Sequence, residues 1–219
     1  MSVADQWFLA TAGHCIQNID EAIKAGYSIA ACNLLDSLGL NALHKEPVPF
    51  SYENSHPTHL VDDEGFDYGI IPLSEIYRGL LEKNSVKPLN EEVWKKQPAP
   101  SNVDFYLLMG IPWDFVAYNP DNVELVTTLH QVEPINERPQ GFTKNKIPLF
   151  YGRINLMEGM THLQGLSGGP IFAFCDRDGQ MKYWLIALQS KGLPESHYIA
   201  ACPTYYLGSA IEKILGSYD

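Results

Sequence analysis

The sequence predicts an all-β fold in which short strands close into a barrel and a helix ends the chain. Three observations support this prediction. Beyond residue 102, apolar segments of strand length recur at fairly regular spacing, separated by Gly, Pro, Asn or Asp. The turn signal DRDG, residues 176–179, joins two of these segments as a hairpin. The last segment, from residue 204 onwards, has the apolar spacing of a helix that packs on a sheet.

In the second half of the chain, each apolar run predicts one strand. The run at 103–112 is stopped by Gly110 and Pro112, and the run at 123–135 alternates between apolar and polar residues. About six such strands followed by one helix predict a small closed barrel. The predicted strands cover residues 103–112, 123–135, 147–157, 169–175, 181–190 and 197–203.

In the first half, strands alternate with helices. Residues 17–25 have helical spacing, with Asn18 or Asp20 as the cap and Gly26 as the stop, and Ser74 opens a second helix over 74–84. The polar, Pro-bearing segment 90–102 is expected to be a linker. Strands are predicted near residues 6–16, where the strand runs into a turn, and at 27–35, 59–61 and 67–74.

Composition narrows the class of protein. Of 219 residues, 45% are apolar and 19% are charged, which is ordinary for a soluble globular protein. No stretch approaches the roughly 20 apolar residues of a membrane span, so no membrane partner is expected. A net charge of −11 without a basic stripe argues against a nucleic-acid partner. The N-terminus does not resemble a signal peptide, which favours the cytoplasm, although a chain that begins further upstream would remove that argument.

The four cysteines, at positions 15, 32, 175 and 202, show no metal-type spacing. In a chain of this length they are expected to be thiols, although an even number also allows disulfides. Neither a metal nor another cofactor is expected. The motif HPTH, residues 56–59, and the acids after it could offer metal ligands, but Pro57 prevents a regular helix and no third ligand spacing is present. Structural or solvated histidines are therefore favoured.

The run LQGLSGGPIFAF, residues 163–174, places Ser167 among three glycines and a proline. Glycine allows the main chain to turn sharply, so the hydroxyl lies exposed beside backbone N–H groups. Acyl-transfer chemistry needs this geometry, because nucleophile and oxyanion donors must converge on one carbonyl. An ordinary Gly-rich turn explains this segment alone equally well.

A serine becomes a nucleophile only when a base removes its proton and a third group orients the base. His14 is the candidate base, because the run ATAGHC places it where an apolar strand ends in a turn of small residues. Asp67 is the candidate acid, since it directly precedes the apolar run YGIIPL, whereas residues 62–64 form a polar run that is expected to be solvated. The resulting order is His14, Asp67, Ser167.

Together, the segments TAGHC, DYGIIPL and GLSGGPI resemble the three signature segments of trypsin-like serine proteases of the chymotrypsin fold, most closely the bacterial trypsin-like peptidases. The resemblance implies two β-barrels of chymotrypsin type, over residues 1–90 and 103–219, with the site between them. It implies a serine endopeptidase acting on polypeptides, with Ser167 as nucleophile, His14 as general base and Asp67 as its orienting acid. The backbone N–H groups of Gly165 and Ser167 would form the oxyanion hole.

The resemblance also implies a specificity pocket and a mode of activation. Thr161 would lie at the floor of the pocket, with Ser190 and Gly192 in its wall. No buried carboxylate is expected there, so a preference for Lys or Arg is not supported. Thr161, His162 and Lys191 could favour a polar or acidic side chain. Leu166 stands where zymogen-type relatives carry an acid that pairs with a new N-terminus, so activation by N-terminal cleavage is not expected.

The front of the chain departs from the family pattern. Only thirteen residues precede His14, enough for one strand where the family has three, so the first barrel is predicted to be incomplete. An incomplete barrel leaves unpaired N–H and C=O groups along an edge. Either the chain begins further upstream, or a partner chain or the helical segment 17–25 covers the gap.

A second function therefore stays open beside the peptidase. A trypsin-fold protein whose damaged first barrel no longer aligns the triad would serve as a peptide-binding or regulatory module. The presence of all three predicted catalytic side chains favours activity, and the short segment before His14 favours the binding or regulatory module.

Overall fold

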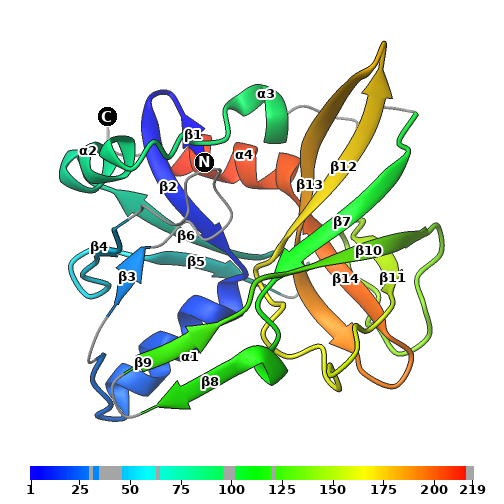
Figure 1. The fold of residues 1–219 in the computed structure, drawn as a ribbon, viewed down its shortest axis with the longest axis horizontal. Coiled ribbons are helices and arrows are strands. Elements are labelled where there is room, and N and C mark those ends of the chain that lie inside the picture. The colour runs from blue at the N-terminus through cyan, green and yellow to red at the C-terminus, as the bar shows by residue number, and fades with distance from the viewer. Residues whose placement is uncertain (30–31, 35–45, 63–64, 96–101, 120–121, 216–219) are drawn as a thin grey trace.

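The computed structural model describes residues 1–29, 32–34, 46–62, 65–95, 102–119 and 122–215. Among these residues strands predominate over helices, and they are arranged in barrel-like sheets with a few helices around them, which confirms the all-β prediction (Figure 1). The described residues contain no helix that is both long and apolar enough to span a bilayer.

The second half of the chain forms a closed barrel. Antiparallel strands follow one another around it in the order β10, β11, β14, β13, β12, β7, so its six strands leave no free edge. Leu108, Ile171 and Ile199 are fully buried inside it. The strands are β7 (Phe105–Gly110), β10 (Thr128–Ile135), β11 (Phe150–Ile154), β12 (Pro170–Arg177), β13 (Gln180–Leu193) and β14 (Tyr198–Pro203).

One predicted strand of this half is wrong. Residues 123–135 form two strands in different sheets. The chain leaves the barrel after Gly110, at the end of β7, and rejoins it only at Thr128, the first residue of β10. A short 3-10 helix, η2 (Trp113–Phe115), leads from β7 into a separate hairpin of β8 (Val116–Asn119) and β9 (Asn122–Leu125). Alternation indicates a strand but not the sheet that the strand joins, so the sequence pattern merged β9 with β10.

The first half forms an open sheet in the order β1, β2, β6, β5, with a separate pair of short strands, β3 and β4. Within the described residues, an open sheet in the first half, a closed barrel in the second half and a C-terminal helix agree with the predicted all-β class. The elements are β1 (Ser2–Val3), β2 (Gln6–Thr11), β3 (Asn33–Leu34), β4 (Val48–Pro49), β5 (Thr58–Val61), β6 (Asp67–Leu73) and the helices α1 (Gly13–Lys24) and α2 (Glu75–Lys83).

The helix predicted at residues 17–25 begins earlier, at Gly13. His14 therefore lies in the first turn of α1 and not in a turn after the strand. Ser74 precedes α2 as predicted, but its side chain makes no capping hydrogen bond. Of the strand predicted at 27–35, the described residues contain only β3.

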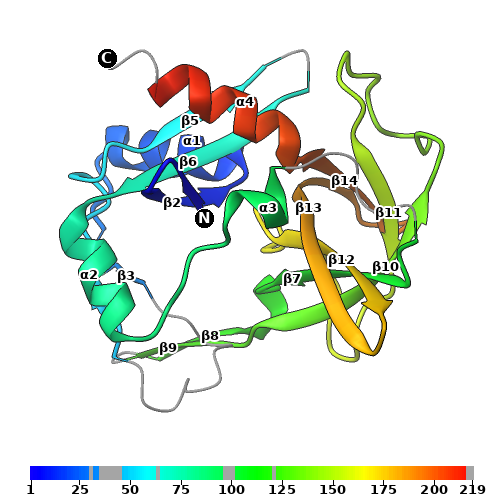
Figure 2. The ribbon, with the colours of Figure 1, turned by 90° about the horizontal axis from the view of Figure 1, so that it is seen from above.

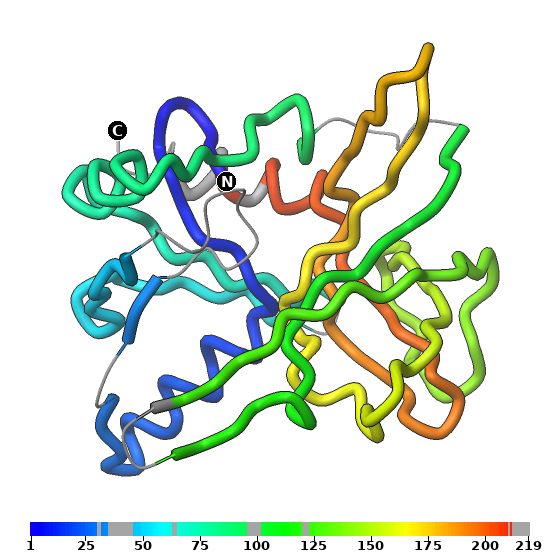
Figure 3. Tube along the Cα trace, in the orientation of Figure 1, coloured from blue at the N-terminus to red at the C-terminus, as the bar shows by residue number. Residues whose placement is uncertain are grey.

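The linker prediction is wrong for residues 91–94, which form the helix α3 (Glu91–Trp94), while residues 96–101 lie outside the described residues. Trp94 is 1% exposed and packs edge-to-face against Phe8, with ring centroids 5.8 Å apart. The C-terminal helix α4 (Thr204–Leu215) returns toward the N-terminal strands, as the views from two sides show (Figures 1 and 2). One apolar cluster therefore contains Val3 and Phe8 together with Leu207 and Ile211, and the two halves share a core. In the tube of Figure 3, the first strands and the C-terminal helix run close to each other.

Candidate active site

Asp67 and His14 are held together by two hydrogen bonds. Asp67, the first residue of β6, places Oδ2 2.8 Å from Nδ1 of His14, and its Oδ1 accepts the backbone N–H of His14 at 2.8 Å. The first N–H groups of a helix have no partner within the helix, and the N-cap residue Ala12 offers no side-chain acceptor. The carboxylate of Asp67 therefore caps a free backbone N–H in the first turn of α1 and orients the imidazole at the same time.

Ser190 supplies the third hydrogen bond to Asp67, because its hydroxyl donates to Oδ2. Burial by itself would raise the pKa of Asp67, which is only 4% exposed, but the hydrogen bonds from His14 and Ser190 hold this pKa below its ordinary value. The same hydrogen bond to Asp67 raises the pKa of His14 above its ordinary value of 6.5. The pair thus favours an ionised acid beside an imidazole that accepts a proton readily.

The turn around Ser167 is anchored on both sides by the barrel. Leu166 is fully buried in the barrel core, so the residue before the serine cannot move freely. After the serine, the N–H of Gly168 donates to the carbonyl of Gln189 at 2.8 Å, and the N–H of Gln189 donates to Gly169 at 2.9 Å. Gly168 has φ +81°, which L residues with side chains rarely adopt, and this explains the glycine.

The structure brings the serine turn against the segment that carries His14. The thiol of Cys15 lies 3.8 Å from the backbone oxygen of Ser167. A Cβ on Gly168 would overlap Oγ1 of Thr11 and lie 2.9 Å from the N atom of Ala12. Residues more than 150 positions apart in the sequence thus meet at one place, with β2 and α1 on one side and the barrel on the other.

The two predicted oxyanion donors lie on the same turn. Gly165 has φ +89°, and a Cβ there would lie 2.8 Å from the N atom of Trp113, so only glycine fits. Among the hydrogen bonds between described residues, none uses the N–H of Gly165 or that of Ser167 as a donor. Unpaired N–H groups on a glycine turn are suited to binding an anionic oxygen.

The three predicted pocket residues have different surroundings. Thr161 is exposed and donates through its N–H and its hydroxyl to Asp114, at 2.8 and 3.0 Å, while Ser190 directs its hydroxyl to Asp67. Gly192 packs against Leu163, because a Cβ there would lie 2.7 Å from Cδ1 of that residue.

Sequence reasoning missed Asp114. Its carboxylate also accepts the N–H of His162 at 3.1 Å, and the hydrogen bonds from Thr161 and His162 lower its pKa. Asp114 stands 47 residues before Thr161, in the short helix η2, so no local signal in the sequence links the two.

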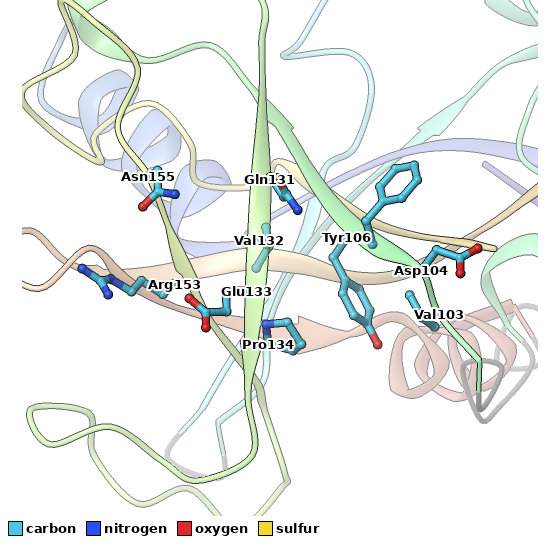
Figure 4. Close-up of a pocket in the computed structure, with 10 residues that line it drawn as sticks. Val103, Asp104, Tyr106, Gln131, Val132, Glu133, Pro134, Arg153 and Asn155 are labelled. Carbon is cyan, nitrogen blue, oxygen red and sulfur yellow. The ribbon is translucent and has the colours of Figure 1, made fainter. Parts of the chain in front are cut away.

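A cavity of about 360 Å³ lies elsewhere, on the side of the barrel formed by β7, β10 and β11 (Figure 4). Its lining includes Asp104, Tyr106, Glu133 and Arg153, and none of the predicted site residues. The chemistry predicted for Ser167 is therefore not located in this cavity.

The cysteines of the described residues are all free thiols, and Cys175 and Cys202 are buried. No group of three or more His, Cys, Asp or Glu side chains in the described ranges is arranged to hold a metal ion. Nδ1 of His59, in the HPTH motif, lies 3.9 Å from Oδ2 of Asp20, and both side chains are partly exposed.

No model of a known protein family matches this sequence, and no curated protein is similar to it. Among solved structures, it is similar to the tobacco vein mottling virus protease, at 9% identity and a TM-score of 0.39, covering 90% of this chain and 65% of that one. It is also similar to a catalytically inactive tobacco etch virus protease in complex with substrate, at 13% identity and 0.37, with coverages of 90% and 66%. A third is the Rv3671c protease in its inactive form, at 15% identity and 0.35, with coverages of 78% and 69%.

The chain thus spans about two thirds of the length of these proteases.

Proposed function

We propose that this protein is a serine endopeptidase that hydrolyses polypeptides through Ser167, His14 and Asp67. One observation carries the proposal. The carboxylate of Asp67 holds the ring and the backbone of His14, each at 2.8 Å, beside a glycine turn that carries Ser167. A buried ionised acid bonded to Nδ1 leaves the other ring nitrogen available as a base, which is the arrangement that activates a serine.

The reaction would proceed in two halves. Ser167 Oγ attacks the carbonyl carbon of the peptide bond while Nε2 of His14 takes its proton, and the N–H groups of Gly165 and Ser167 stabilise the oxyanion. His14 then gives the proton to the leaving amine, the C–N bond breaks, and an acyl ester remains on Ser167. Water attacks that ester, with His14 again taking a proton, and the acid product leaves as Ser167 regains its hydrogen.

Substrate selection is proposed to depend on Thr161, Ser190 and Gly192. Two carboxylates are bonded to these residues, and both already accept hydrogen bonds within the protein. Asp114 accepts three from residues 161 and 162, and Asp67 accepts the hydroxyl of Ser190 and both the ring and the backbone N–H of His14. A preference for a polar or acidic side chain therefore fits better than a preference for Lys or Arg. We further propose that residues 1–90 supply the base and acid and residues 103–219 the nucleophile.

A fluorophosphonate probe tests the proposal directly, because it forms a covalent bond only with an activated serine. The wild type should be labelled at Ser167, as peptide mass mapping would show, and Ser167→Ala should not be labelled. Ser190→Ala retains the nucleophile and is expected to label more slowly. Labelling that persists in Ser167→Ala, or a folded wild type that is not labelled, would contradict a serine peptidase and favour the peptide-binding module.

A further inference from the structure

The hairpin formed by β8 and β9 exposes one apolar face to solvent. Residues paired directly across antiparallel strands point to the same side, and Val116 pairs with Leu125 while Tyr118 pairs with Val123. Tyr118, Val123 and Leu125 are 64%, 51% and 54% exposed. Together with Trp113, whose ring centroid lies 6.0 Å from that of Tyr118, these four paired residues form what we call the hairpin face.

The opposite side of the same strands carries Ala117 and Glu124, so the hairpin is apolar on one side only. Two-stranded hairpins are marginally stable by themselves in water. An exposed apolar face on such a hairpin is therefore typical of a surface that binds a partner.

The root of the hairpin is attached to the loop that carries the proposed oxyanion donor. The N–H of Trp113 donates to the carbonyl of Gln164 at 2.9 Å, directly before Gly165. The next residue, Asp114, holds Thr161 of the proposed pocket through two hydrogen bonds. The hairpin face is thus adjacent in the chain and in space to the proposed substrate pocket. In both ribbon views, the hairpin extends from the barrel toward the first half of the chain (Figures 1 and 2).

We propose that the hairpin face binds an apolar segment of the polypeptide substrate, next to the peptide bond that is cleaved. An extended peptide can place alternate side chains on such a face and pair its backbone with the free edge of β8 or β9, since the described residues give each of these strands only one neighbour. This inference rests on the proposed peptidase function, but the binding can be measured without cleavage.

Two features argue for a peptide and against a second copy of the chain. The half-exposed side chains of the face present on the order of 400 Å², whereas a stable interface buries about 800 Å² on each partner. Each copy also carries a net charge of −11, which opposes self-association.

Cleavage of paired peptides tests the proposal. A cleavage site is first mapped on an unfolded protein, and quenched peptides are made with that site and with Leu and Val, or Ser and Gly, flanking it on either side. Wild-type protein should cleave the peptide with an apolar flank with about tenfold higher kcat/KM, mostly through KM. Tyr118→Ser/Val123→Ser should lose this difference, and the control on the opposite side, Ala117→Ser/Glu124→Gln, should keep it. Equal cleavage of all peptides by the wild type, or an equal loss in the control, would overturn the proposal.

Binding to Ser167→Ala protein separates this proposal from the proposed function. Fluorescence anisotropy should show tighter binding of the peptide with the apolar flank, and the Tyr118→Ser/Val123→Ser change should remove that preference. Binding with this preference but no hydrolysis by the wild type would contradict the peptidase function and leave the docking surface in place. Hydrolysis by the wild type without any preference for the apolar flank would support the peptidase function and contradict the docking surface. A dimer in sedimentation experiments that the same double change dissociates would assign the hairpin face to a second copy and overturn the proposal.

Discussion

At the scale of single residues, the site depends on the hydrogen bonds that the buried carboxylate of Asp67 accepts. Its two carboxylate oxygens accept the ring of His14, the backbone of His14 and the hydroxyl of Ser190. A buried charge is stable only when hydrogen bonds replace the water that it has lost. Asp67 therefore stays ionised while it is almost completely buried, and its charge is directed at His14.

Replacing Asp67 by Asn should change both the rate and its pH dependence. Activity of the wild type should rise with pH as His14 loses its proton, with a midpoint above the ordinary histidine value of 6.5, because Asp67 raises the pKa of His14. Asp67→Asn should lower turnover by about 10⁴, which is the loss expected for the orienting acid of the proposed triad. It should also lower the pKa of His14, which an NMR titration of the ring would measure.

The matched control is Asp62→Asn, since Asp62 is an exposed carboxylate that accepts the backbone N–H groups of Gly65 and Phe66 near β6. It should leave both the rate and the His14 titration close to the wild-type values. An Asp67→Asn protein with nearly normal turnover would mean that another residue is the acid.

Ser190→Ala should reduce stability and increase sensitivity to acid. The hydrogen bond from Ser190 to the charged Asp67 is worth about 2 kcal/mol. Because folding lowers the pKa of Asp67, its contribution to stability is present above the unfolded pKa and is lost as pH falls through the folded pKa. Without Ser190 the folded pKa should rise, so acid unfolding followed by circular dichroism should occur at higher pH.

Ser55→Ala is the matched control for this change, because Ser55 is another buried serine, with its hydroxyl 2.6 Å from a backbone oxygen. It should cost about 1 kcal/mol without moving the acid midpoint or the rate of labelling of Ser167. An equal acid shift in both variants would show that Ser190 has no specific effect on Asp67.

At the scale of elements, the serine turn and the start of α1 fit together only because of glycine. Gly168 combines a positive φ with close contacts to Thr11 and Ala12 from the other half of the chain. The close packing of the Ser167 turn against Thr11 and Ala12 therefore depends on the absence of one Cβ.

Gly168→Ala should separate these two elements, and Gly179→Ala is the matched control. Both glycines have positive φ, at +81° and +76°, but a Cβ on Gly179 would meet nothing within 4 Å. Gly179→Ala should therefore cost only about 1 kcal/mol of stability and leave the labelling of Ser167 unchanged. Gly168→Ala should cost about 2 to 3 kcal/mol and slow labelling about 100-fold. Labelling of Gly168→Ala at the wild-type rate would show that the contact with Thr11 does not position the serine.

At the scale of the whole molecule, Trp94 joins the two halves. Its ring packs against Phe8, its indole N–H donates to the carbonyl of Ser2 at 3.3 Å, and its carbonyl accepts the hydroxyl of Thr204 at 2.8 Å. The first strand and the last helix therefore meet at one side chain, and the halves are expected to unfold together.

Trp94→Ala should destabilise the whole chain by about 3 to 5 kcal/mol, as measured by denaturant unfolding. Trp113→Ala is the control at an exposed tryptophan, 56% exposed, and should change stability by no more than about 0.5 kcal/mol. Two separate transitions in the wild type, with only one of them shifted in Trp94→Ala, would contradict a shared core.

Local pattern was enough to predict the barrel of the second half, and it singled out candidate residues for the site, whose roles stay predictions. Alternating strands, the DRDG turn and the terminal helix depend on neighbours within a few residues, and so do the glycines around Ser167. The linker prediction failed at α3, because the polar composition of residues 90–102 gave no sign that Trp94 is buried. Local pattern also failed at the boundary between β9 and β10, since alternation does not state which strand is the neighbour.

By itself, the sequence determined the all-β class, the closed barrel and the residue types available for chemistry, because these follow from periodicity and from side-chain chemistry. Only the tertiary structure decided which groups meet. The hydroxyl of Ser190 bonds Asp67 across 123 residues, Asp114 holds Thr161 across 47, and Gly168 packs against Thr11. Contacts between residues far apart in the sequence depend on how strands pair and how the two halves pack together. No local sequence pattern encodes which of these residues meet.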